Sequence, residues 1–393
     1  MTLRGKKILL GITGGIAAYK ACELLRILQK RYAEVRVVMT NEAAKFVGQT
    51  TFAALSNFPV YTTAADSKPF QHIDYPRWAD IYIIAPCSAT SLARLVAGTG
   101  EEPVSLCFLA MKGEKLVVPA MNSVMYNSPA VQRNLEILRS WGVRVMEPVV
   151  GHLACGEKGA GKFPEPEDIA DELEFGSTKA GKTLLITIGR TQEAIDPVRY
   201  ISNRSSGKTG EAIVKEFLSK GWRVIAVCGQ MDVKLPKQCE KIEVENAESM
   251  NKAVLEMQPQ AHVIVHCAAV ADYRPKQIAS QKIKNSKAIQ KLELKETQNI
   301  LKNTIKNKKE EQIIVSFALE TEKTFENAKK KFKDGSMDIL IVNTAASGKG
   351  GFGKDFVEYG ILTRGNSEIK LEYSTKEWLA LQLFREINEE TDD

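Results

Sequence analysis

A polar loop near the middle of the chain combines hydroxyl groups, cations and glycine in a pattern that suits a bound anion. The loop spans residues 189–210 of 393, between an apolar segment and a helical pattern. Ser205, Ser206 and Gly207 stand where the helix should begin, directly after Arg204. Hydroxyls and unpaired backbone N–H groups at a helix N-terminus favour an anion. The loop is therefore a candidate phosphate site.

A Walker P-loop does not explain this segment. Gly207-Lys208-Thr209 supplies the end of the Walker sequence, but the motif requires another glycine five residues earlier, where Ser202 stands. An ordinary capped connection between a strand and a helix remains an alternative. The length and polarity of the loop favour a binding site instead.

The first apolar segment of the chain ends in a glycine turn. Residues 6–12 read as a buried strand, Gly14 and Gly15 follow, and residues 16–30 have the apolar spacing of a helix. The turn lacks the G-x-G-x-x-G pattern of dinucleotide sites, so a mononucleotide with a single phosphate fits better. Glycine at such a turn can also serve backbone geometry alone.

Two later strand ends in the first half also carry small polar residues. They are the segments 86–91 and 119–126. Because parallel strands end on a common edge of their sheet, we expect these segments to lie beside the glycine turn. The sequence thus predicts one site assembled from several strand ends.

His72 and Cys155 are candidates for acid–base and thiol chemistry. His72 precedes a helical stretch and could act as a general base near neutral pH, although a lone loop histidine is more often surface decoration. Cys155 belongs to the glycine-rich segment 154–162. That segment is either a mobile loop or a flap that carries a thiol over a site.

Alternating strand and helix patterns predict an α/β fold with parallel sheets in both halves of the chain. We expect domains at residues 1–175 and 183–393, joined by a linker at 176–182 that is small, charged and rich in glycine. The strands are expected at residues 6–12, 34–39, 80–85, 115–119, 183–188, 223–228, 263–267, 313–317 and 338–342.

The composition is that of an ordinary globular protein, with 44% hydrophobic residues, 26% charged residues and a net charge of +6. Lysines in residues 302–309 and 329–333 have helical spacing, and we interpret them as solvated helix faces rather than a nucleic-acid site. Seven cysteines without a CxxC pair indicate reduced thiols in a cytoplasmic protein and argue against structural zinc. No segment reaches the roughly 20 apolar residues of a membrane span.

The first half resembles the flavin-containing cysteine decarboxylases. His72 matches the active-site histidine of that family, residues 119–126 match its PxMNxxMW motif with Tyr126 in place of tryptophan, and Cys155 matches its flap cysteine. The resemblance implies a flavodoxin-like or Rossmann-like flavin-binding sheet.

The second half resembles the phosphopantothenate–cysteine ligases, which have a Rossmann-like nucleotide-binding domain. Residues 196–210 match the motif DPVRxISNxSSGxxG, residues 268–274 match AAVAD(Y/W)R and residues 317–321 match FAxET. Residues 282–285 match KxKK, with Asn285 in place of the last lysine. The whole chain thus resembles the bifunctional coenzyme A biosynthesis proteins, which fuse the two enzymes.

The resemblance implies FMN in the first half, where transient oxidation of a substrate thiol allows the loss of CO₂ from 4′-phosphopantothenoylcysteine. It implies that His72 assists this oxidation, that Asn122 orients the substrate carboxylate and that Cys155 donates a proton. The cofactor-binding residues that it implies are Gly14, Gly15, Thr40, Ser88, Thr90 and Met121.

For the second half, the resemblance implies that CTP and Mg²⁺ convert 4′-phosphopantothenate to an acyl-cytidylate, from which the amine of cysteine displaces CMP. Asn203 would act on the acyl intermediate and Lys282 would neutralise phosphate. No protein residue is expected as a metal ligand. Further nucleotide- and substrate-binding residues would be Ser205, Ser206, Gly207, Ala269, Asp272, Lys284 and Phe317.

Two alternatives belong to other functional classes. One is a non-catalytic FMN-binding regulatory protein that retains only the ligase activity. The other treats the second half as a nicotinamide dehydrogenase, which fold analogy alone supports. The chain departs from the family patterns at Thr90, Lys162 and residues 101–103. The resemblance also implies a homo-oligomer, a dodecamer built from decarboxylase trimers and ligase dimers.

Overall fold

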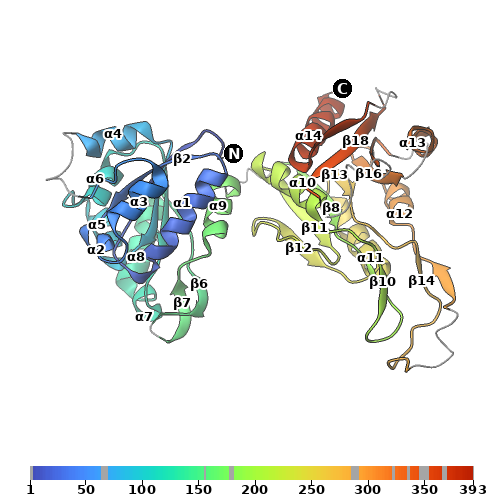
Figure 1. Ribbon diagram of the computed structural model, residues 1–393, viewed down its shortest axis with the longest axis horizontal. Coiled ribbons are helices and arrows are strands. Elements are labelled where there is room, and N and C mark those ends of the chain that lie inside the picture. The colour runs from blue at the N-terminus through green and yellow to red at the C-terminus, as the bar shows by residue number, and fades with distance from the viewer. Residues whose placement is uncertain are drawn as a thin grey trace. The chain divides into compact units, whose positions relative to one another are not determined.

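The computed structural model describes residues 3–62, 70–154, 156–176, 181–284, 292–320, 324–333, 337–344, 354–364 and 370–392. The chain divides into two compact units, Met1–Gly176 and Ser177–Asp393, here called unit 1 and unit 2. Each unit has a central sheet with helices packed on it (Figure 1).

The sheet of unit 1 is parallel and has five strands in the order β2-β1-β3-β4-β5. Every residue of β3 is buried, as expected for a parallel sheet that is covered on both faces. The strands are β1 (Lys7–Ile12), β2 (Glu34–Met39), β3 (Ile81–Cys87), β4 (Glu114–Pro119) and β5 (Arg144–Val145).

Helices cover both faces of this sheet (Figure 1). Ile8 and Leu10 of β1 belong to the core on one face, and Leu9 belongs to the core on the other. The first face carries α1 (Lys20–Lys30), α3 (Gln49–Ser56) and α9 (Pro166–Phe175). The second face carries α4 (Gln71–Trp78), α5 (Ala89–Ala97), α6 (Pro103–Ala110) and α8 (Pro129–Ser140).

Short elements complete unit 1 near the carboxyl edge of the sheet. An antiparallel hairpin joins β6 to β7. The short elements are η1 (Ile16–Tyr19), α2 (Asn41–Ala44), α7 (Ser123–Tyr126), β6 (Val149–His152) and β7 (Lys158–Lys162).

The sheet of unit 2 has eight strands in the order β12-β11-β8-β13-β16-β17-β18-β19. It is parallel as far as β17, and β18 and β19 add antiparallel pairs. The strands are β8 (Thr183–Ile188), β11 (Arg223–Cys228), β12 (Glu240–Glu243), β13 (Val263–His266), β16 (Ile313–Glu320), β17 (Ile339–Thr344), β18 (Phe356–Thr363) and β19 (Glu372–Thr375). Two short ribbons pair β9 (Gln192–Ala194) with β10 (Tyr200–Ser202) and β14 (Tyr273–Pro275) with β15 (Leu294–Glu296).

In unit 2, α10 (Lys208–Ser219) packs against α14 (Lys376–Asp392) through aromatic rings. The ring of Phe217 lies 5.1 Å from that of Phe384 and 5.2 Å from that of Trp222, edge to face in both cases. These contacts fix the two helices to each other. The other helices are α11 (Ala247–Met257), η2 (Gln258–Gln260), α12 (Ile300–Lys306) and α13 (Thr324–Lys333).

The expected α/β class with parallel sheets is confirmed, and the strands expected at 34–39, 183–188 and 223–228 have those bounds. The expected helix at 16–30 begins as the 3₁₀ turn η1 before α1 continues it. The antiparallel strands β18 and β19 and the hairpin β6–β7 were not expected. In the described part of the chain, no helix combines the length and the apolar character that crossing a membrane requires.

Candidate active sites

Unit 1 has a cavity of about 540 Å³ where strands β1, β3 and β4 end. The hairpin β6–β7 contributes the opposite wall, through residues 152–154 and 161–163. The structure therefore brings the expected strand ends into one site. The predicted residues that line it are Gly14, Gly15, Ser88, Met121 and Asn122.

Thr13, which no motif singles out, joins two of these strand ends. Its hydroxyl is fully buried, donates to the Pro86 carbonyl at 2.9 Å and accepts the Ser88 N–H at 2.8 Å. Ser88 in turn caps α5, because its hydroxyl accepts the Ser91 N–H at 3.2 Å. Threonine after a strand also serves as an ordinary cap, so the sequence alone did not distinguish this residue.

The hairpin packs on the cavity wall through a glycine. Gly161 has a φ of 127°, and a Cβ at this position would lie 2.2 Å from the Met121 carbonyl oxygen. The Met121 N–H donates to the Gly161 carbonyl at 3.1 Å. Only glycine permits both this conformation and this approach.

Asn122 connects the hairpin to the same wall. Its Oδ1 accepts the Val124 N–H at 2.8 Å and caps α7, and its Nδ2 donates to Glu157 Oε2 at 2.7 Å. The Asn122 amide is thus oriented by the backbone of α7, while its N–H group faces a carboxylate. A substrate carboxylate would satisfy the same donor.

Lysines bring positive charge to this cavity. Lys20 Nζ lies 3.0 Å from Glu165 Oε2, and Lys162 Nζ lies 4.0 Å from Glu165 Oε1. Both lysines line the cavity, together with apolar side chains such as Ile16 and Phe163. A cavity with apolar walls, a few polar groups and cations suits a flat ring system that carries an anionic group.

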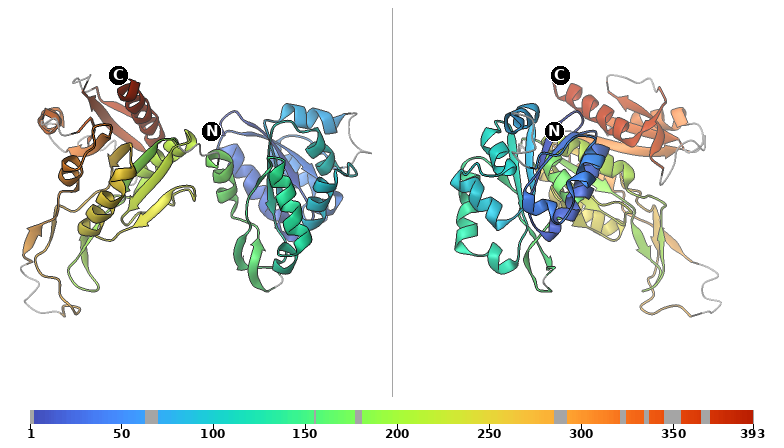
Figure 2. Two further views of the ribbon diagram at one scale, coloured as in Figure 1. Left: turned by 180° about the vertical axis from the view of Figure 1, so that it is seen from behind. Right: turned by 60° about the vertical axis from the view of Figure 1, so that its left-hand side comes forward.

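Three of the other residues predicted for unit 1 do not line this cavity. Thr40 is buried and caps α2, where its hydroxyl accepts the Ala43 N–H at 3.1 Å. Thr90 is exposed in the first turn of α5. His72 lies on α4, at the end of unit 1 opposite to the hairpin (Figures 1 and 2). Cys155 falls outside the described residues.

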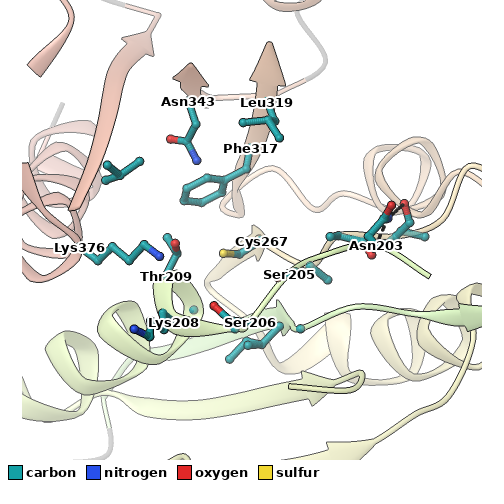
Figure 3. Close-up of a pocket in the computed structure, with 18 of the residues that line it drawn as sticks. Asn203, Ser205, Ser206, Lys208, Thr209, Cys267, Phe317, Leu319, Asn343 and Lys376 are labelled. Atoms are coloured by element: carbon teal, nitrogen blue, oxygen red, sulfur yellow. Dashed lines mark hydrogen bonds between the residues drawn. The ribbon is translucent and has the colours of Figure 1, made fainter. Parts of the chain in front are cut away.

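Unit 2 has a cavity of about 490 Å³ at the carboxyl edge of its parallel strands (Figure 3). The ends of β8, β13, β16 and β17 bound it, together with the first residues of α10 and α14. The predicted residues that line it are Asn203, Ser205, Ser206, Gly207, Ala269, Asp272 and Phe317.

The N-terminus of α10 opens directly onto this cavity. A Cβ on Gly210 would lie 2.7 Å from Ile188 Cγ2, so glycine lets the helix pack closely on β8. Gly207 precedes the first helical residue, and no side chain caps the helix there. Uncapped N–H groups and the helix dipole therefore favour an anion at this point.

Buried threonines hold the opposite wall, residues 268–271. Thr187 Oγ1 accepts the Ala268 N–H at 3.2 Å, and Thr191 Oγ1 accepts the Ala271 N–H at 2.9 Å. Neither threonine was predicted to have a role in the site. Thr187 is a polar residue within the apolar strand β8, and Thr191 lies in the loop that follows this strand. These positions are the only features of the sequence that could have indicated their roles.

Asn203 lies against this wall with a defined orientation (Figure 3). Its Nδ2 donates to the Ala269 and Val270 carbonyls, at 3.1 Å in each case. Because both partners are acceptors, the amide nitrogen must face them. The Asn203 carboxamide therefore offers its oxygen, an acceptor, to a ligand.

Lys282 and Lys284 are exposed and do not line the cavity. Ile283 between them is held by Asp196 and Arg199: its N–H donates to Asp196 Oδ2 at 3.2 Å, and its carbonyl accepts from Arg199 at 2.9 Å. Arg199 Nε also donates to Asp196 Oδ2 at 3.0 Å. The hydrogen bonds from Arg199 hold the pKa of Asp196 well below its usual range.

Cys267, Asn343 and Lys376 line the cavity although no site role was predicted for them. Burial raises the pKa of Cys267 to about 12, so the thiol stays neutral at physiological pH. Asn343 Oδ1 is buried and has no hydrogen-bond partner among the described residues. Lys376 is only 6% exposed.

Two family models match the chain, one in each unit. The Flavoprotein family matches residues 1–174, and the family described as "DNA/pantothenate metabolism flavoprotein C-terminal domain" matches residues 179–391.

The chain is also similar to named proteins. It is 38% identical to the coenzyme A biosynthesis bifunctional protein CoaBC of Bacillus subtilis, over 98% of this chain and 97% of that protein. It is 39% identical to the protein of that name from Haemophilus influenzae, over 99% of this chain and 98% of that protein. The solved FMN-dependent cysteine decarboxylase SpaF is 28% identical over 43% of this chain and 95% of its own, with a TM-score of 0.38.

Gly161→Ala should loosen the hairpin from the cavity wall. The added methyl group would contact the Met121 carbonyl, and the residue would also be strained, so we expect unit 1 to lose more than about 1 kcal/mol of unfolding free energy. Hydrogen exchange at the Met121 amide, with limited proteolysis of residues 149–162, measures this.

The matched control is Gly156→Ala in the same hairpin. Gly156 also has a positive φ, 89°, but a Cβ on this residue would have no described atom within 4 Å. Equal effects of the two substitutions would show that close packing on Met121 is not the reason for glycine.

Asp196→Asn should release the segment that carries Lys282. The neutral amide binds Arg199 and the Ile283 N–H more weakly, so we expect roughly tenfold faster hydrogen exchange at Ile283. Since the pKa of Asp196 is lowered in the folded chain, the wild type should show the same loosening only as pH falls below the usual range of an aspartate. Unchanged exchange in Asp196→Asn, with Asp232→Asn as a control, would contradict the role of Asp196.

Proposed function

This chain belongs to the family of bifunctional coenzyme A biosynthesis proteins, and we propose from its two cavities how each activity is carried out. Unit 2 ligates cysteine to 4′-phosphopantothenate, and unit 1 decarboxylates the product to 4′-phosphopantetheine. The observation that carries the residue assignments is that Asn203, Ser205, Ser206, Gly207, Ala269, Asp272 and Phe317 line a single cavity.

The ligase reaction needs an activated carboxylate, because a carboxylate oxygen is a poor leaving group. We propose that CTP, with Mg²⁺ on its phosphates, binds in the unit 2 cavity and forms an acyl-cytidylate, with release of pyrophosphate. Ser205, Ser206 and the uncapped N-terminus of α10 supply donors for a phosphate group. Lys282 and Lys284 lie on the segment clamped by Asp196, from which they would reach the phosphates of a bound substrate.

Asn203 is proposed to act in the second half of this reaction. Its nitrogen is occupied by the Ala269 and Val270 carbonyls, so its oxygen is the atom that faces a ligand. An amide oxygen accepts a hydrogen bond from an amine. Asn203 would therefore orient the amine of cysteine for attack on the acyl carbon, from which CMP leaves.

In unit 1, we propose that FMN occupies the 540 Å³ cavity, whose apolar walls and cations suit a ring system with a phosphate. When bound, FMN supplies the transient oxidation of the substrate thiol that makes the loss of CO₂ possible. The Asn122 amide, which already faces the Glu157 carboxylate, would bind the carboxylate of the substrate. Gly14, Gly15, Ser88 and Met121 would contact the cofactor.

His72 and Cys155 complete the proposed decarboxylase. Because α4 lies at the far end of unit 1, His72 would serve the cavity of a neighbouring copy in a homo-oligomer (Figures 1 and 2). The dodecamer implied by the family is consistent with such sharing. Cys155 follows cavity-lining Ala154 in the chain, and we assign it the proton donation. We further propose that the protein acts in the cytoplasm on small molecules alone.

Asn203→Ala should separate the two halves of the ligase reaction. Pyrophosphate and the acyl-cytidylate should still form, whereas the cysteine adduct should form roughly 100-fold more slowly. Rapid quench with separation of the nucleotide products measures both steps. Asn307→Ala, at an exposed residue directly after α12, is the control. Normal ligation by Asn203→Ala would refute the role.

The two activities are tested together in one assay. The purified protein is incubated with 4′-phosphopantothenate, CTP, Mg²⁺ and cysteine, and we expect pyrophosphate, CO₂ and 4′-phosphopantetheine. ATP in place of CTP tests the choice of nucleotide. A colourless protein that releases no flavin on denaturation would refute the role of FMN.

A further inference from the structure

A buried cation faces the unit 2 cavity from the first residue of α14. Lys376 is only 6% exposed, and its side chain extends toward Thr209 and the start of α10 (Figure 3). No predicted motif includes it. It contributes to the cavity from residues near the end of the chain, far in sequence from the loop at 189–210.

Lys376 has no anionic partner among the described residues. No hydrogen bond or ion pair within 4.0 Å joins its Nζ to a described carboxylate, and the nearby Asp355 is instead bound by Lys208 Nζ at 2.6 Å. The Asp355 side chain is 76% exposed, and the Asp355 backbone carbonyl accepts a hydrogen bond from the Lys376 N–H at 3.1 Å. A buried ammonium without a counter-ion is unfavourable unless a ligand supplies one.

The charged and titratable groups around Lys376 leave its ammonium without a paired carboxylate among the described residues, although Asp272 also lines the cavity. Burial, followed by repulsion from Lys208, lowers the pKa of Lys376, whereas Cys267, Asp355 and Glu377 act in the opposite direction. Because the Cys267 thiol is neutral and Asp355 is bound by Lys208, neither neutralises the ammonium.

The cation and the helix N-terminus are held on one rigid support. Phe217 of α10 packs on Phe384 of α14 with ring centroids 5.1 Å apart, so the two helices are fixed to each other. The uncapped N-terminus of α10, the Lys208 side chain and Lys376 all border the same cavity. Donors held in place before binding lose little freedom when an anion arrives.

We propose that Lys376 is a phosphate-binding residue, which neutralises a phosphate group of a substrate between the N-termini of α10 and α14. The proposal rests on the proposed function, in which CTP and 4′-phosphopantothenate both carry phosphate. It deepens that function because it assigns a binding charge to a rigid helix, in addition to the lysines on the exposed segment of Lys282. Either substrate could be the source of the phosphate, and the experiment distinguishes them.

The test compares the affinities of wild type, Lys376→Met and Lys376→Arg by calorimetry. The ligands are CTP and cytidine in one arm, and 4′-phosphopantothenate and pantothenate in the other. We expect Lys376→Met to lose roughly 10- to 100-fold in affinity for one phosphorylated ligand, with no change for its unphosphorylated form. Lys376→Arg, which keeps the charge, should recover most of the loss.

The control is Lys215→Met, because Lys215 lies on α10 outside the cavity and pairs with Glu211 at 2.8 Å. It should bind every ligand as the wild type does. The arm that responds identifies the substrate. Unchanged affinity of Lys376→Met for both phosphorylated ligands, or an equal loss for phosphorylated and unphosphorylated forms, would overturn the proposal. A wild type that binds neither CTP nor 4′-phosphopantothenate would refute the ligase function itself.

A second measurement uses the wild-type protein, so it tests the proposal even if Lys376→Met fails to fold. Reductive methylation followed by mass spectrometry reports which lysines are accessible. Because Lys376 borders the cavity but is only 6% exposed, we expect it to be methylated slowly in the free protein and more slowly still with bound CTP or 4′-phosphopantothenate, whereas the methylation of Lys215 should not change. Equal modification of Lys376 with and without each ligand would contradict the proposal.

Discussion

A parallel sheet that is covered on both faces exposes unpaired backbone polar groups only along its edge strands and where its strands end, and the strand ends form the cavities of both units. Helices seal the faces, so a ligand can reach the backbone only at an edge. The carboxyl edge is also where the following helices begin, and it therefore gathers free N–H groups. Both cavities form there, one after β1, β3 and β4 and the other after β8, β13, β16 and β17.

Different contacts hold the walls of the two cavities in place. In unit 1, the Thr13 hydroxyl joins two strand ends, and a separate hairpin closes the wall through Gly161. In unit 2, buried threonines fix one wall, and the aromatic contact between α10 and α14 fixes the other. Unit 2 thus combines cations on rigid helices with further lysines on the segment held at Ile283. A charge on a fixed helix favours ligands whose anionic group lies at one position, whereas lysines on an exposed segment can adjust their position to a bound ligand.

The α/β class and the sheet-edge location of the two cavities could be predicted, because buried parallel strands read as apolar runs and several of these runs were followed by small polar residues. The hairpin could not, because the sequence of β7, Lys-Gly-Ala-Gly-Lys, has little strand propensity and depends on the Met121 contact. The family motif indicated His72 as a candidate residue, but it could not indicate that α4, which carries His72, lies away from the cavity of unit 1. Lys376 was missed because its burial arises from tertiary packing of α14 on α10.

The late position of α14 in the sequence also affects the order in which the two cavities can form during protein synthesis. The cavity of unit 1 is built from residues 13–163, so its walls can assemble while the ribosome is still making unit 2. The cavity of unit 2 needs residues from 188 to 376, and its last wall is held by a helix that ends at Asp392. Contacts of such long sequence separation form late. A nascent chain would therefore complete the cavity of unit 1 before that of unit 2.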